Sequence, residues 1–185
     1  MSILTLAVKS IDQLNDSTEV GSDEPFVLVT AVNLSDIVPQ LEVVRYGPLE
    51  NEGTFRHQLF WGLDNKHAAV ITDPNDVVFI VSLMEKDDGN LAVSRIIVKM
   101  AAIGSLIGSM GMPRSTRVQN LIKDIRFAMG IRTGIPSADD SVGVHELILT
   151  PTDLTPSASK KRIRSIDFHG GKEGSFRVNI ELNFE

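Results

Sequence analysis

The clearest hydrophobic pattern lies at the end of the chain. Over residues 176–184, five apolar side chains alternate with polar ones, namely Phe176, Val178, Ile180, Leu182 and Phe184. Alternation with a period of two is typical of a strand with one buried face and one solvent-exposed face. A similar alternation over residues 3–14 predicts another strand near the start of the chain.

Six further apolar segments have the length and composition of strands. They are residues 25–34, 41–46, 55–61, 77–84, 142–150 and 163–168. Turn-forming pairs such as Gly47-Pro48 and Asp88-Gly89 separate several of them. About eight strands is the count of an antiparallel Greek-key sandwich. We therefore expect a mainly β fold, an eight-stranded antiparallel β-sandwich.

The hydrophobic period changes in the middle of the chain. Two stripes recur every three or four residues, one of Val93, Ile96, Met100, Ile103 and Ile107, the other of Val118, Leu121, Ile122, Ile125, Ala128 and Met129. This spacing predicts two helices. We expect Ser115 to cap the second helix and Gly130 to end it. The break at Gly111-Met112-Pro113 makes residues 90–138 an inserted α-helical hairpin within a single domain, 1–185.

Composition narrows the class of protein. At 185 residues and 42% hydrophobic, the chain is sufficient for one packed domain. Its net charge of −6 argues against a general nucleic-acid binder, and the absence of cysteine excludes disulfides and thiolate metal sites. The apolar run over residues 1–8 is too short for a signal peptide, and Arg95 and Lys99 interrupt the run over 91–112. We expect a soluble protein whose location the sequence does not indicate.

Acidic residues gather at the ends of predicted strands. The groups are Asp16, Glu19, Asp23 and Glu24, then Glu85, Asp87 and Asp88, then Asp139 and Asp140. Alternate loops of a sandwich meet at one end, so such a fold would bring the three groups together. Converging carboxylates repel one another unless solvent or a hard cation neutralises them, and calcium takes six to eight oxygen ligands. Solvated acidic loops are the alternative interpretation.

Around these acids the chain resembles the C2 domain, a calcium- and phospholipid-binding β-sandwich. The first strand leads to Gly21-Ser22-Asp23-Glu24-Pro25-Phe26, which is similar to the family's Ser-Asp-Pro-Tyr loop. Glu85-Lys86-Asp87 is similar to the acid-x-acid pair of the family's later calcium loop. Asp140-Ser141-Val142-Gly143 is similar to the Asp-x-x-Gly that opens the next strand. The resemblance covers the chain outside residues 90–138.

The resemblance implies a calcium site with Asp23, Glu85, Asp87 and Asp140 as ligands and Asp16 as a weaker candidate. The chain departs from the family pattern in three places, one of which is that the inserted hairpin splits the later calcium loop. An extra Glu24 precedes Pro25, so either Asp23 or Glu24 occupies the ligand position, and Ser17 stands where the first loop's other aspartate is expected. The implied function is calcium-dependent binding to anionic phospholipid membranes, with no enzymatic activity and no nucleic-acid partner.

The hairpin suggests how that attachment differs from the family pattern. Gly104 and Gly108 form a small-xxx-small arrangement, which predicts close approach of the two helices. Arg95 and Lys99 lie one turn apart, as in helices that rest on anionic lipid. In the resting state we expect the apolar stripes to pack on each other and on the sandwich. A sharper hypothesis is that the hairpin undocks and inserts, as in a toxin-like, pore-forming protein.

Two other classes of function fit the same residues. One is a metal-free binding or structural module that forms a homo-oligomer through the hairpin. The other is a small hydrolase, because two carboxylates among Glu85, Asp87 and Asp140 would suffice for acid–base hydrolysis.

Overall fold

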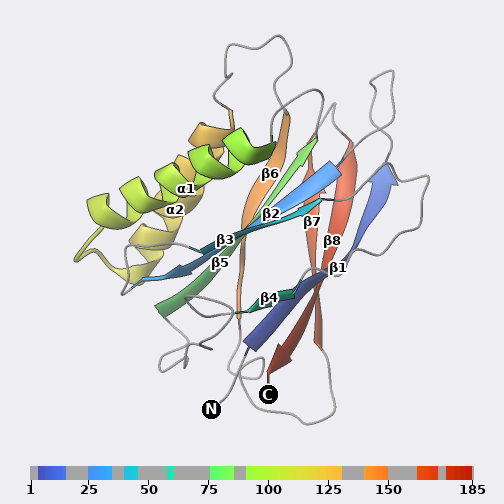
Figure 1. Cartoon of the computed structure of the whole chain (residues 1–185), viewed down its shortest axis with the longest axis horizontal. Coiled ribbons are helices and arrows are strands. Elements are labelled where there is room, and N and C mark those ends of the chain that lie inside the picture. Colours follow the sequence, from blue (N-terminus) through green and yellow to red (C-terminus); the bar gives the residue numbers. More distant parts are fainter. Residues whose placement is uncertain are drawn as a thin grey trace.

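The computed structural model describes residues 4–15, 25–34, 40–45, 58–60, 76–85, 91–130, 140–149, 162–170 and 174–184. Within these ranges the chain forms two antiparallel sheets and two helices (Figure 1). The mainly β architecture predicted from the hydrophobic pattern is confirmed, and a helical pair interrupts it near the middle of the chain.

Each sheet contains four strands among the described residues. The first sheet has the order β4-β1-β8-β7, with bounds Gln58–Phe60, Leu4–Asn15, Ser175–Phe184 and Arg162–His169. The second has the order β3-β2-β5-β6, with bounds Gln40–Arg45, Pro25–Asn33, Val77–Glu85 and Asp140–Leu147. The helices are α1 (Leu91–Gly108) and α2 (Arg114–Met129).

Strand β8 has the one buried face that its alternation predicts. Phe176, Val178, Ile180 and Leu182 are buried between the sheets, and Arg177 between them is exposed. Antiparallel pairing joins β8 to β1 on one side and β7 on the other. The first sheet therefore contributes one face to the core and presents a polar face to solvent.

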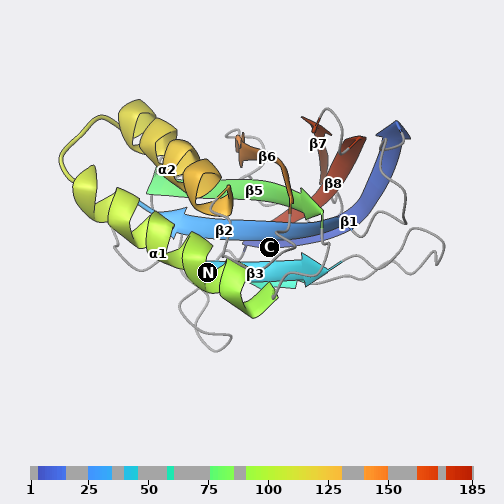
Figure 2. The same cartoon turned by 90° about the horizontal axis from the view of Figure 1, so that it is seen from above.

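Strands β2 and β5 are instead buried on both faces. Val27, Val29, Phe79 and Val81 face the first sheet, whereas Phe26, Leu28, Val78 and Ile80 belong to a second core beneath the helices. Two-sided burial explains why both strands are almost continuously apolar rather than alternating. The result is three layers, with the second sheet between the first sheet and the helices (Figures 1 and 2).

Both helices pack on the second sheet. The buried face was predicted correctly for α2 and incorrectly for α1. In α2 the predicted stripe is buried, through Val118, Leu121 and Ile125. In α1 the buried apolar residues are Val98, Ala102 and Leu106, whereas most of the predicted packing stripe is exposed, namely Val93, Ile96, Met100 and Ile107. The prediction of two helices is thus confirmed, and the prediction of which α1 face packs is wrong. A different apolar stripe, Val98, Ala102 and Leu106, with a spacing of four residues, forms the actual contact.

The helix ends differ in part from expectation. Helix α2 begins at Arg114 after Pro113, which occupies the N-cap without a side-chain cap bond, so the prediction that Ser115 caps it is wrong. Proline has no side-chain hydrogen-bond acceptor, so it provides no side-chain cap for the N–H groups of the first turn. Gly130 ends α2 as predicted, and its N–H donates to the Arg126 carbonyl at 3.1 Å. Gly111, with a φ of 77°, makes the turn between the helices.

Close helix approach at the two glycines is not observed. A Cβ added at Gly104 or Gly108 would have no heavy atom within 4 Å. The predicted small-xxx-small contact is therefore wrong, because both glycines are exposed and Gly104 lines an open groove between α1 and α2 instead of touching α2.

Two hydroxyl groups lie in the second core without a hydrogen-bond partner among the described residues. They are Thr30 Oγ1 on β2 and Ser82 Oγ on β5, both fully buried. A buried hydroxyl without a partner costs about 1–3 kcal/mol.

We therefore predict that Thr30→Val, which keeps the side-chain shape, raises the free energy of unfolding by about 1 kcal/mol. Chemical denaturation measures the change. The matched control is Val29→Thr, which adds a hydroxyl in the other core and is expected to lower the same free energy. A loss of stability in Thr30→Val would contradict the assignment and mean that its hydroxyl is bonded.

Candidate functional site

Three adjacent strands of the second sheet reach the same end of the sandwich. Pro25 at the start of β2 pairs with Glu85 at the end of β5, and Glu85 pairs with Asp140 at the start of β6. Neighbouring strands lie about 4.8 Å apart, so these three backbone positions fall within about 10 Å. They are the points where three acidic segments of the sequence join the sheet. We call this the acidic end.

The first sheet adds a fourth strand to this end. Figure 1 shows β1 ending at the same upper side of the molecule where β2 begins, β5 ends and β6 begins. Asp16 follows directly after the last residue of β1. The four strand ends to which the candidate segments are joined therefore lie on one side of the molecule.

The predicted ligands are described to different extents. Glu85 and Asp140 occupy directly opposed positions on neighbouring strands. Asp16, Asp23 and Asp87, with the alternative ligand Glu24, lie outside the described residues. Asp23 is two positions before Pro25, and Asp87 is two positions after Glu85. The structure thus brings two candidates together and locates the strand ends to which the others are joined.

The chemistry of this donor set suits a hard cation. Glu85 and Asp140 occupy opposed backbone positions, and carboxylates are the ligands that hard cations prefer. Carboxylates alone select calcium or magnesium rather than zinc. Among the described residues no group of three or more acidic or histidine side chains is placed to hold a metal ion. Two carboxylates offer at most four oxygens, so a calcium site also needs further oxygen ligands, which Asp23, Asp87, backbone carbonyls or water would supply.

The hairpin connects at the acidic end and folds back from it. It joins the end of β5 to the start of β6, and the turn between α1 and α2 lies at the far end of the second sheet (Figure 1). Arg126 donates to the Val144 carbonyl at 3.0 Å, and Arg114 pairs with Glu146 at 2.9 Å. These contacts hold α2 against β6. No helix in the described part of the chain is long and apolar enough to cross a membrane.

Gly143, the glycine of the Asp-x-x-Gly motif, has a packing role. An added Cβ would lie 2.9 Å from Cδ1 of Phe168, a fully buried ring on β7. The neighbouring His145 ring meets the same phenyl ring edge-on, with centroids 5.0 Å apart. Burial, and then the nearby charge of Arg126, lower the pKa of His145. The close approach of the two sheets at this edge thus explains the glycine without a ligand.

The outer face of the first sheet holds carboxylates that are already engaged. Arg177 donates to both oxygens of Asp167, at 2.6 and 2.8 Å, and this hydrogen bonding lowers the pKa of Asp167. Asn179 donates to Asp12 at 2.6 Å. These acids are bound within the sheet, which leaves the acidic end as the better candidate for a cation.

Comparisons with known proteins add little. No family model matches the chain, and no curated protein matches it. Among solved structures, a C2 domain of plant extended synaptotagmin 1 is similar at 11% identity and a TM-score of 0.49, covering 100% of this chain and 94% of that one. At that score and identity, no property of the plant domain is transferred to this chain.

The contrast between two glycines gives a test of the packing described above. We predict that Gly143→Ala lowers the free energy of unfolding by about 1–3 kcal/mol, because the new methyl group overlaps the Phe168 ring. Gly104→Ala on the open side of α1 should instead raise it by up to about 1 kcal/mol, through the higher helix propensity of alanine. Equal effects of the two substitutions in thermal or chemical denaturation would contradict this account.

Proposed function

We propose that the chain binds calcium at its acidic end and thereby attaches to anionic phospholipid membranes, as a C2-like domain. The observation that carries the proposal is the register of three adjacent strands, which aligns Pro25, Glu85 and Asp140. Asp23 and Asp87 follow within two residues of this row, and Asp16 follows the end of β1. The resemblance of these segments to C2 calcium loops supports the same assignment.

The mechanism is electrostatic. Without calcium, the carboxylates at the acidic end repel anionic headgroups and one another. A calcium ion bound by Asp23, Glu85, Asp87 and Asp140 would neutralise the end and offer its remaining coordination positions to phosphate oxygens. Glu24 replaces Asp23 in the set if the extra residue before Pro25 shifts the loop.

The sequence also allows a small hydrolase, a pore-forming protein and a module that forms a homo-oligomer. No contact among the described residues favours hydrolysis, pore formation or a homo-oligomer over the calcium hypothesis. Membrane damage is left out of the proposal because α1 and α2 share one core with the second sheet.

Calcium should stabilise the folded chain, because the ion binds the folded state alone. At about a hundredfold over its dissociation constant, it contributes about 2.7 kcal/mol by mass action. For a chain of this size that corresponds to a rise in Tm of about 5–10 °C. Thermal melts with calcium and with excess chelator measure the difference. Superimposed curves would remove the calcium site from the account.

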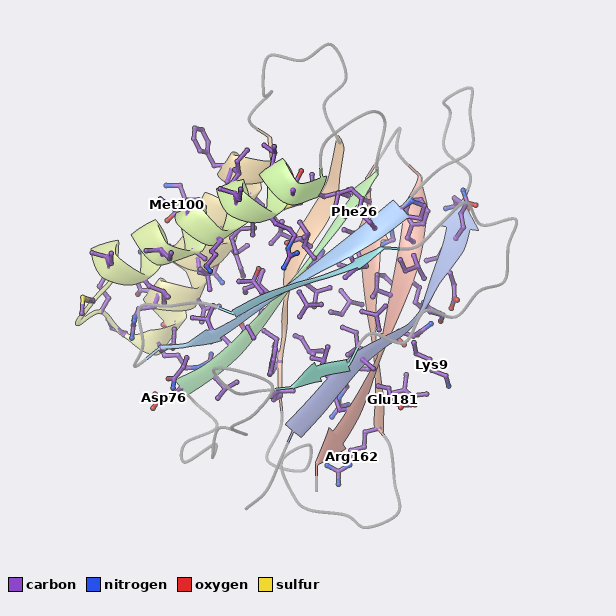
Figure 3. The ribbon with its side chains drawn as sticks, viewed as in Figure 1. Lys9, Phe26, Asp76, Met100, Arg162 and Glu181 are labelled. Carbon is purple, nitrogen blue, oxygen red and sulfur yellow. The ribbon has the colours of Figure 1, made fainter. Side chains whose placement is uncertain are left out.

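Single carboxamide substitutions should locate the site and link it to lipid. We predict that Asp87→Asn and Asp140→Asn each lower calcium affinity at least about tenfold. Each should also remove the calcium-dependent part of binding to phosphatidylserine vesicles. The matched control is Glu181→Gln, which Figure 3 places away from the acidic end and which should keep both responses. Equal loss in the control would mean a nonspecific charge effect.

A further inference from the structure

Helix α1 carries apolar side chains on two faces. Val98, Ala102 and Leu106 are buried against the second sheet. On another side, Ile96 and Met100 are each 63% exposed, and Ile107 is 52% exposed. A helix that is apolar on more than one side is ordinarily covered on each of them, and a contiguous exposed apolar patch marks an interaction surface.

Helix α2 extends the same surface. Phe127 is 75% exposed and shares a groove of about 460 Å³ with Ile96, Met100 and Gly104 of α1. The groove is mainly apolar, with Asp124 and Ser105 as its polar members. We define the outer hairpin face as Ile96, Met100, Ile107 and Phe127. Met100 lies on the side of the molecule away from Lys9 and Glu181 (Figure 3).

The hairpin also has a charge opposite to that of the chain. Residues 91–130 contain six arginines and lysines and one aspartate, a net charge of +5, although the whole chain carries −6. Arg95 and Lys99 on α1 and Lys123 and Arg126 on α2 are exposed. Basic side chains thus flank an apolar face on both helices, which is the pattern of helices that rest in a lipid interface.

We propose that the outer hairpin face docks flat on an anionic phospholipid bilayer without calcium. Charge selects this occupant, because two hairpins of +5 placed face to face would repel, whereas an anionic leaflet attracts each one. Flat docking also leaves Val98, Ala102 and Leu106 in the core, so the sandwich need not open. The contact goes beyond the proposed function, since it does not use the acidic end.

The two contacts occupy different parts of one molecule. The acidic end lies where the hairpin begins and ends, so calcium bound there would neutralise the nearest source of repulsion from the leaflet (Figure 1). Membrane binding is therefore the sum of a basal contact through the hairpin and an increment that calcium adds.

The test is co-sedimentation of the full chain with phosphatidylcholine–phosphatidylserine vesicles in chelator. Ile96→Gln combined with Met100→Gln removes exposed apolar surface without changing charge, and should lower the partition coefficient at least about tenfold. Lys99→Gln and Lys123→Gln should each lower it about fivefold. Ile163→Gln and Lys9→Gln are matched controls outside the hairpin and should leave it unchanged. All substituted side chains are at least partly exposed, and thermal melts check that each variant folds.

Three results would overturn this proposal. The first is that the parent chain does not bind vesicles in chelator, and the second is that the hairpin variants bind as well as the controls. The third is that the parent chain does not bind vesicles but forms a dimer in sedimentation velocity, and that Ile96→Gln combined with Met100→Gln dissociates this dimer. The last would assign the face to a second copy of the chain. Asp87→Asn separates the two proposals, because it should remove the calcium increment and keep basal binding. Hairpin-dependent binding with no calcium increment would overturn the calcium site alone.

Discussion

Burial of β2 and β5 on both faces is the constraint on which the rest of the structure depends. One face of each strand completes the sandwich core, and the other requires a cover. Exposing Phe26, Leu28, Val78 and Ile80 to water would cost about 1.5–3 kcal/mol for each side chain, which is comparable in sum to the stability of a whole domain. The hairpin is therefore a structural layer of this protein as well as an insertion between two strands.

The same two strands position the candidate chemistry. Because β2 begins, β5 ends and β6 begins in one row, acids far apart in sequence meet at one end. Because the hairpin covers β2 and β5, one side of α1 is fixed against the sheet and its second apolar side is left outward. Both proposed membrane contacts thus follow from the way the second sheet is buried.

The parts of the fold predicted from sequence are those that local pattern determines. Period two identified β8, helical spacing identified the buried face of α2, and Gly130 marked its end. The outward face of α1 was not predictable in this way, because that helix has two apolar stripes and only the tertiary contact decides which one packs. Nearly continuous apolar runs in β2 and β5 were a usable signal that a further layer covers the sandwich.

In the candidate site too, the features that depend on tertiary contacts were not predictable from the local sequence. That Glu85 and Asp140 are neighbours required the strand register, which a one-residue slip would change. The packing role of Gly143 was also not predictable from its motif, because the Phe168 ring that fills the space beside it comes from a distant strand. Exposed Phe127 was missed since it lies off the apolar stripe of α2, although its position one helical turn after Lys123 and Asp124 was visible in the sequence.

The most direct test of the calcium site is an amide NMR spectrum of the isotope-labelled chain during a calcium titration. The account predicts saturable shifts at Phe26, Glu85 and Asp140, at the acidic end of the second sheet. The opposite ends of the same strands, at Asn33, Val77 and Leu147, should be unaffected and serve as an internal control. An unchanged spectrum, or shifts at the opposite ends instead, would contradict it.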